Sequence, residues 1–133
     1  MLIGTTPDKE KSESILKMVE TTLEMISETN FKKYPSNVTK EYYEIIRELI
    51  SVILLLDGYK TFGEGAHKEL IDYLTKNCSD FTQQELNLIE ELRKLRNKVA
   101  YDGFFIDKSY IERNKSYFLE IIKKLKQIIT RKL

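Results

Sequence analysis

The segment from residue 41 to residue 56 reads EYYEIIRELISVILLL and contains the longest unbroken apolar run of the chain, Val52 to Leu56. Apolar side chains cover nearly every direction around a helix of about 3.6 residues per turn, so that helix has no face left for solvent. They are Tyr42, Tyr43, Ile45, Ile46, Leu49, Ile50, Ile53, Leu54 and Leu56. The pattern predicts a buried central helix that begins at about Thr39.

Two amphipathic segments flank this helix and predict helices of their own. The first is expected to start with Thr6 as N-cap and Pro7 at the first helical position, and to end at about Asn30. A turn at residues 34–37 then leads into the central helix. After the central helix in the sequence, a loop with three glycines at residues 58–65 leads to a short helix at residues 66–74.

Capping residues predict where the last two helices begin and where the first of them ends. Thr82 with Glu85 three residues later is a capping box, and this helix is expected to end at Asp102-Gly103. Asp107 caps the final helix, which follows the apolar connector Phe104-Phe105-Ile106. With only five Gly and two Pro in 133 residues, the sequence predicts an all-α, up-down bundle of about five helices that forms one domain over residues 1–133.

Composition limits the chemistry and the compartment. The chain has one cysteine and one histidine, so no internal disulfide and no zinc ligand set is expected, and Cys78 is interpreted as inert. No cofactor is predicted. The longest apolar run is far below the roughly 18 residues that indicate a membrane span, and the acidic N-terminal segment does not resemble a signal peptide. We expect a cytoplasmic protein without a membrane partner.

Charge is distributed unevenly along the chain. Residues 1–92 carry 10 Lys and Arg against 17 Asp and Glu, whereas residues 93–133 carry 12 against 4. This asymmetry has two explanations: contact with a polyanion, or internal charge matching together with basic helix C-termini. The basic series at the end of the chain is read as a solvated face by default, with nucleic-acid contact as the alternative. The series consists of Lys123, Lys124, Lys126, Arg131 and Lys132.

A polar stripe stands out on the helix that ends at Asp102. Residues 92–103 read LRKLRNKVAYDG, and at roughly 100° per residue the stripe falls within an arc of about 140°. Its members are Arg93, Arg96, Asn97, Ala100 and Tyr101. A guanidinium, an amide and a phenol above a glycine turn could bind phosphate, contact a partner helix or line a catalytic cleft.

The order of these parts resembles the HEPN family, the higher eukaryotes and prokaryotes nucleotide-binding domain, in its small stand-alone form. The resemblance covers residues 41–125 and includes the LLDGYK turn at residues 55–60 and the helix at 66–74. The family signature is an Arg, commonly followed by a polar residue such as Asn, with a His four to six positions beyond the Arg. Arg96 and Asn97 match this signature, and Tyr101 stands where the His is expected.

The resemblance implies a helical bundle that forms a homodimer, with Arg96, Asn97 and Tyr101 near the dimer cleft. Active members of the family cut RNA without metal, using the Arg and the His of two subunits. A phenol with a pKa near 10 is a poor base at neutral pH, so Tyr101 supplies only half of such a mechanism. We therefore expect a catalytically degenerate module that binds RNA, a nucleotide or a partner protein in a toxin-antitoxin or defence-type system.

The expected binding residues are Arg93, Arg96, Asn97, Tyr101 and His67. A small nucleotidyltransferase or an antitoxin is the partner protein that the resemblance suggests. The alternative is a toxin-like, metal-independent endoribonuclease that uses Arg96 with Tyr101, or with His67 supplied from elsewhere in the dimer.

Each of these residues also has a purely structural interpretation. Arg96 could bond a neighbouring carboxylate or favour the helix dipole. Tyr101 is interpreted first as an aromatic lid on the core beside Phe104 and Phe105, with its hydroxyl exposed. His67 is most simply surface or core filler.

Overall fold

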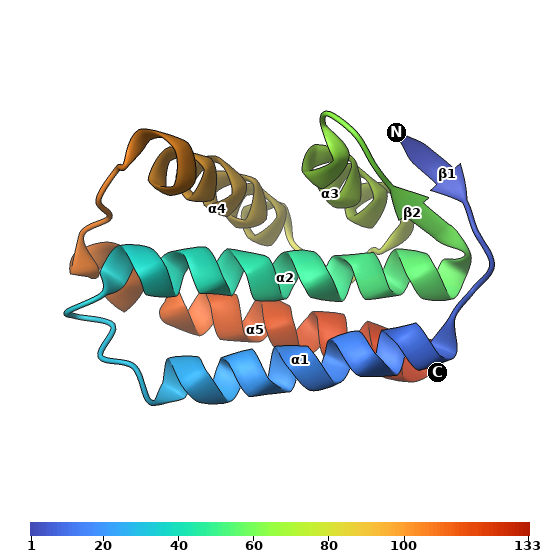
Figure 1. Ribbon diagram of the computed structural model, residues 1–133, viewed down its shortest axis with the longest axis horizontal. Coiled ribbons are helices and arrows are strands. Elements are labelled where there is room, and N and C mark those ends of the chain that lie inside the picture. The colour runs from blue at the N-terminus through green and yellow to red at the C-terminus, as the bar shows by residue number, and fades with distance from the viewer.

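Figure 1 shows the computed structural model, which describes residues 1–133. The chain forms five helices and a small antiparallel sheet, so the predicted all-α bundle is confirmed. The elements are β1 (Leu2–Gly4), α1 (Lys9–Ser27), α2 (Pro35–Asp57), β2 (Tyr59–Thr61), α3 (Ala66–Asn77), α4 (Gln83–Asp102) and α5 (Lys108–Lys132). None of the helices combines the length and apolar character needed to cross a membrane.

Helix α2 lies in the middle of the bundle and contacts every other helix. In Figure 1, α1 and α5 lie on one side of α2, and α3 and α4 lie on the other. Because other helices cover α2 on both sides, apolar side chains can point in nearly every direction around it and still be buried. The prediction of a buried central helix is therefore confirmed.

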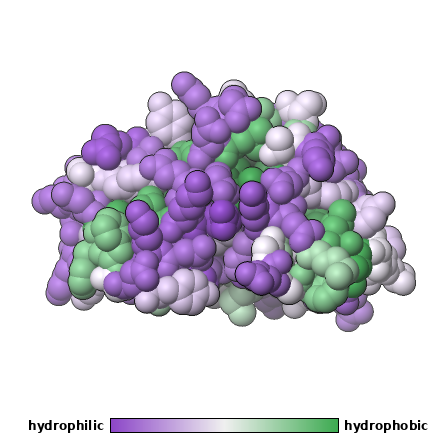
Figure 2. Space-filling model, turned by 90° about the horizontal axis from the view of Figure 1, so that it is seen from above, coloured by the Kyte–Doolittle hydropathy of each residue, from purple (hydrophilic) through white to green (hydrophobic).

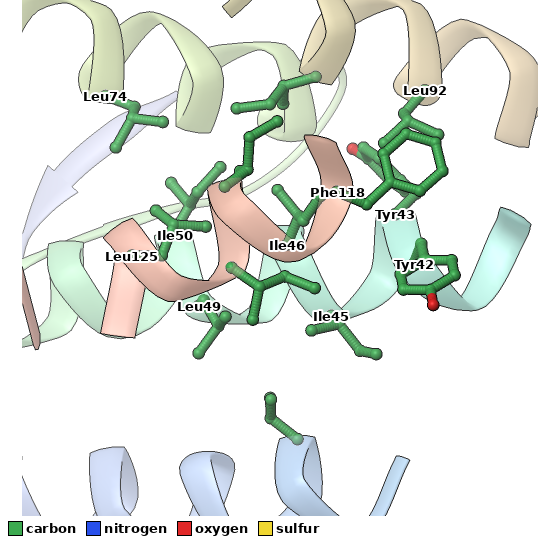
Figure 3. Close-up of a cluster of buried hydrophobic side chains, with 14 of the residues drawn as sticks. Tyr42, Tyr43, Ile45, Ile46, Leu49, Ile50, Leu74, Leu92, Phe118 and Leu125 are labelled. Atoms are coloured by element: carbon green, nitrogen blue, oxygen red, sulfur yellow. The ribbon is translucent and has the colours of Figure 1, made fainter. Parts of the chain in front are cut away.

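The core forms where the other helices pack against α2. Figure 3 shows side chains of α2 meeting Phe118 and Leu125 of α5, Leu74 of α3 and Leu92 of α4. The largest fully buried members from α2 are Tyr42, Tyr43, Ile45, Ile46, Leu49, Ile50, Ile53 and Leu54. Each large apolar side chain that is fully buried stabilises the fold by about 1.5–3 kcal/mol relative to an exposed one.

The start of α1 differs from the prediction. Asp8, not Thr6, is the N-cap, and its Oδ1 accepts a hydrogen bond from the Lys11 N–H at 2.9 Å. The chain before it is held in the sheet, because the Thr5 N–H donates to the Gly58 carbonyl at 2.8 Å. Helical geometry therefore begins later, at Lys9, and α1 ends at Ser27 rather than near Asn30.

Helix α2 also begins elsewhere than predicted, at Pro35 instead of Thr39. Proline suits the first helical position because its φ is already helical and it has no N–H to leave unpaired. Ser36, read from the sequence as part of a turn, is a buried first-turn residue whose Oγ accepts a hydrogen bond from the Ile106 N–H at 2.7 Å. This bond ties the α4–α5 connector to the start of α2.

The predicted caps of α4 and α5 are confirmed. Both bonds of the Thr82–Glu85 capping box are present, at 2.9 and 3.1 Å. Asp107 accepts from the Ser109 N–H at 3.1 Å. Gly103 ends α4 with a left-handed φ of 64°, a conformation that glycine adopts without steric cost.

The small sheet joins the N-terminal segment to the turn after α2. β1 pairs with β2 in antiparallel register, with Ile3 opposite Lys60. The turn begins at Gly58, whose φ is 89° and where an added Cβ would lie 3.2 Å from the Thr5 carbonyl oxygen. Gly58 is thus fixed both by its backbone conformation and by the close approach of the N-terminal segment.

Candidate functional site

Arg96 of α4 is anchored on the central helix. Its Nε donates a hydrogen bond to Glu44 Oε1 of α2 at 3.0 Å, and the two side chains are only 20% and 23% exposed. The other oxygen of Glu44 accepts from Nε and Nη2 of Arg47 at 3.0 and 2.8 Å. One carboxylate therefore holds two guanidinium groups in fixed positions.

This arrangement keeps the Glu44 carboxylate ionised. Burial alone would raise the pKa of Glu44, but the hydrogen bonds and positive charges of Arg47 and Arg96 outweigh burial and lower it. Arg47 makes a further ion pair with Glu48 at 2.8 Å. The interpretation that Arg96 bonds a neighbouring carboxylate is therefore confirmed, and that bond reaches across two helices.

The three signature residues of α4 lie together at the surface. Arg96 Nη1 is 3.5 Å from both Asn97 Oδ1 and the Tyr101 hydroxyl, which is the long limit of a hydrogen bond. The Arg96 guanidinium carbon lies 5.9 Å from the centre of the Tyr101 ring. Since these contacts are weak, Arg96 Nη1 can exchange them for a stronger acceptor at little cost.

Tyr101 is not a lid on the core, so that interpretation is wrong. Its side chain is 76% exposed, and Phe105 beside it along the chain is 88% exposed. The reason is that α4 ends at Asp102 and the connector turns outward at Gly103, so only Ile106 reaches the interior. Tyr101 instead lies free at the surface beside Arg96.

Arg93, the other arginine of the stripe, is tied to its own helix. Its Nε and Nη2 donate to the two oxygens of Glu90 at 2.9 and 2.6 Å. A bidentate pair of this kind uses the fork of the guanidinium. Arg93 therefore has fewer donors to offer a ligand than Arg96, whose Nη2 makes no hydrogen bond within the chain.

His67 of α3 joins this cluster from within the same chain. Its ring centre lies 6.1 Å from that of Tyr43 on α2. Burial and the positive charges of Arg47, Arg96 and Arg93 lower the pKa of His67, and the opposing effect of Glu44 does not compensate. The imidazole therefore remains neutral at neutral pH.

Sequence reasoning missed two members of the cluster, Glu44 and Arg47. Both are charged residues that interrupt the apolar pattern of α2, and they are three positions apart on one helical face. Charged side chains on an otherwise buried helix require partners, which was the available signal. Their partner Arg96 lies 52 residues away in the sequence and could not be identified from spacing.

The connector after α4 exposes two large aromatic side chains. Phe104 is 46% exposed and Phe105 is 88% exposed, and Lys98 Nζ lies 5.6 Å from the centre of the Phe104 ring. Figure 2 views the molecule from the side of α3 and α4, where hydrophobic side chains gather in separate areas among hydrophilic ones. Apolar surface on this face is thus local and bordered by polar groups.

The basic series of α5 lies at the surface, as the prediction of a solvated face has it: Lys123, Arg131 and Lys132 are exposed. Four of its five cations pair with carboxylates of other elements. The pairs are Lys124–Glu85 at 2.7 Å, Lys126–Glu20 at 2.5 Å, Arg131–Asp80 at 3.0 Å and Lys132–Asp57 at 2.7 Å. Internal charge matching therefore accounts for most of the positive charge in this series.

Cys78 ends α3 and is half-buried. Burial raises the pKa of its thiol, which lowers the fraction of reactive thiolate. This environment agrees with the expectation of an unreactive cysteine.

Comparison with known proteins gives no match: the chain is similar to no family model, no curated protein and no solved structure.

Proposed function

We propose that this protein is a HEPN-like module that binds RNA through a backbone phosphate at Arg96, Asn97 and Tyr101. The resemblance at Arg96 and Asn97 supports this assignment at the level of sequence. Position 101 holds a tyrosine where the family signature has a histidine. This favours binding over catalysis, because a phenol does not shuttle protons near pH 7.

One observation carries the proposal: Arg96 is anchored through Nε while its two Nη groups remain available. The hydrogen bond from Nε to Glu44 Oε1, 3.0 Å long, holds the guanidinium in place. Nη1 has only two long contacts of 3.5 Å, to Asn97 Oδ1 and to the Tyr101 hydroxyl. A guanidinium matches the geometry of a phosphate and can donate two parallel hydrogen bonds to it. The side-chain amide of Asn97 and the hydroxyl of Tyr101 add neutral donors beside it.

The proposal includes a homodimer in which the stripe of one copy lies near the stripe of the other. It also includes a protein partner, a small nucleotidyltransferase or an antitoxin. Both come from the family resemblance. Sedimentation of the purified chain tests the dimer: a stable interface buries at least roughly 1,000 Å² and survives at micromolar concentration. A monomer at high micromolar concentration would remove this part of the proposal.

Binding of a labelled, unstructured RNA tests the phosphate site. Arg96→Ala should weaken binding about tenfold or more, because a charge-assisted bidentate contact is lost, and Arg96→Lys should restore only part of it. The variant should still fold, since Glu44 keeps its pair with Arg47. Arg131→Ala removes the same charge from an exposed pair on α5 and serves as the control. Equal losses in both variants would show only a general charge effect.

His67 supports a second candidate function, metal-independent RNA cleavage. Its imidazole packs near Tyr43 of α2, the helix whose Glu44 anchors Arg96, and with its lowered pKa it could accept a proton at neutral pH. The test is cleavage of labelled RNA in EDTA by the wild type and by His67→Gln. Cleavage by the wild type that both His67→Gln and Arg96→Ala abolish would establish the enzyme in place of the binding module.

A further inference from the structure

Three aromatic side chains are exposed around the end of α4. Tyr101 is 76%, Phe104 is 46% and Phe105 is 88% exposed, and they fall within five consecutive residues. Burying large apolar side chains would stabilise the fold. Their gathering at the surface therefore indicates a surface that binds a ligand or partner. None of the three rings is buried in the core, and Phe105 is the most exposed of them.

Cations accompany these rings. The Arg96 guanidinium lies 5.9 Å from the Tyr101 ring centre, and Lys98 Nζ lies 5.6 Å from the Phe104 ring centre. Lys98 and Lys108, which bracket the connector in the sequence, form no ion pair within the chain. Asp102 is also exposed there. Asp107, the N-cap of α5, is exposed as well, so the two lysines are matched by two carboxylates in this segment. The cations that lie directly over rings are Arg96 and Lys98.

The connector is fixed at both ends. The N–H groups of Gly103 and Phe104 both donate to the Lys98 carbonyl, which fastens the first part of the connector to the last turn of α4. At the other end, the buried Ile106 N–H donates to Ser36 Oγ at 2.7 Å. The rings are therefore carried on a restrained backbone, which reduces the entropy lost when a ligand orders them.

We infer that Tyr101, Phe104 and Phe105 form a stacking surface for the unpaired bases of a single-stranded RNA whose phosphate contacts Arg96. This inference rests on the proposed function and adds to it a ligand class. Exposed aromatic rings interleaved with cations are what single strands require, since the bases stack on the rings and the cations follow the backbone. Paired bases are already stacked inside a duplex and present no free face.

A second copy of the chain fits this surface less well. The cores of protein interfaces are depleted in lysine, and Lys98, which forms no ion pair within the chain and lies over the Phe104 ring, would be buried by a second copy that covered this surface. A dimer that leaves Phe104 and Phe105 uncovered agrees with the inference. A dimer that covers them contradicts it.

The test measures binding of a labelled oligouridylate of about 12 nucleotides, its abasic counterpart and a duplex of equal length. The wild type should prefer the single strand with bases to the abasic strand by about 5- to 100-fold. Phe105→Ala combined with Phe104→Ala should remove this preference, whereas Phe105→Tyr, which keeps a ring, should retain it. Phe62→Ala is the control, since Phe62 is 49% exposed and directly follows β2, which lies at the opposite end of the bundle from the α4–α5 connector (Figure 1).

The outcomes separate the two proposals. If Arg96→Ala weakens binding but base-containing and abasic strands bind equally, the phosphate site stands and the stacking surface is overturned. If no strand binds, the proposed function itself fails. If the double phenylalanine variant changes the sedimentation of the protein without RNA, the rings belong to an interface between copies and the inference is overturned.

Discussion

Two parts of the surface are rich in cations, and they differ in whether those cations form ion pairs within the chain. In the C-terminal half of α5, four of the five lysines and arginines of the basic series pair with carboxylates of other elements. Around the connector between α4 and α5, Lys98 and Lys108 form no ion pair within the chain, and Lys98 lies over the exposed Phe104 ring. The first group holds helices together, whereas the second is available to a ligand. The distribution of charge along the sequence does not distinguish these two groups of cations, because the fold decides which cations meet a carboxylate.

The largest effect should come from restoring an imidazole at the α4 end. Tyr101→His places a group that titrates near neutral pH within the Arg96 contact network, and general acid–base catalysis contributes on the order of 10²–10⁴ in rate. We expect little ribonuclease activity from the wild type and clear, EDTA-resistant cleavage by the variant. The measurement is the rate of cleavage of a labelled RNA.

Two controls accompany that comparison. Tyr101→His combined with Arg96→Ala should lose the gained activity, since the developing negative charge would no longer be stabilised. Tyr101→Phe should remain as inactive as the wild type. Cleavage by the wild type that depends on Arg96 would contradict the binding-module proposal.

A smaller effect should come from breaking an ion pair of α5. Lys124→Met keeps the aliphatic stem but leaves the buried Glu85 carboxylate without its cation, which should lower the free energy of unfolding by about 1–3 kcal/mol. Lys98→Met, at the α4 end, should change stability by less than about 0.5 kcal/mol. Urea denaturation of both variants measures the difference, and equal losses would erase the distinction between the two groups of cations.

Local features of this fold could be predicted from the sequence, whereas contacts between distant residues could not. The Thr82–Glu85 capping box and the all-round apolar pattern of α2 involve neighbouring residues, and both predictions are confirmed. Pro35 was misread because proline suits a turn as well as the first position of a helix.

The candidate site was predictable only in part, for the same reason. The helical stripe correctly brought Arg96, Asn97 and Tyr101 together, because helical spacing decides that contact. The pairing of Arg96 with Glu44 and the approach of His67 depend on how α2, α3 and α4 pack. The exposure of Tyr101 depends on the direction of the connector after Gly103, which sequence patterns do not give.

Acid should weaken the α5 pairing before the fold is lost. Burial raises the pKa of Glu85, but the hydrogen bonds from Lys124 and Thr82 outweigh it and lower the pKa below its ordinary value of 4.5. A lowered pKa in the folded state gives stability that is present above that ordinary value and disappears as pH falls through the lowered one. The stability difference between wild type and Lys124→Met should therefore be largest at neutral pH and shrink as the pH falls below 4.5. Thermal melts across this range measure it, and a constant difference would contradict the role of Glu85.

The smallest effect concerns salt and compares one lysine from each group. If Lys98 contacts an RNA phosphate, its binding releases counterions, and Lys98→Ala should lower the slope of log affinity against log salt by about 0.7 for a single strand. Lys126→Ala should leave that slope unchanged, because Lys126 is already paired with Glu20 at 2.5 Å. Fluorescence anisotropy at several salt concentrations gives both slopes. A loss of slope for Lys126→Ala alone would assign the RNA backbone to α5, and would show that the intramolecular ion pairs there open when RNA binds.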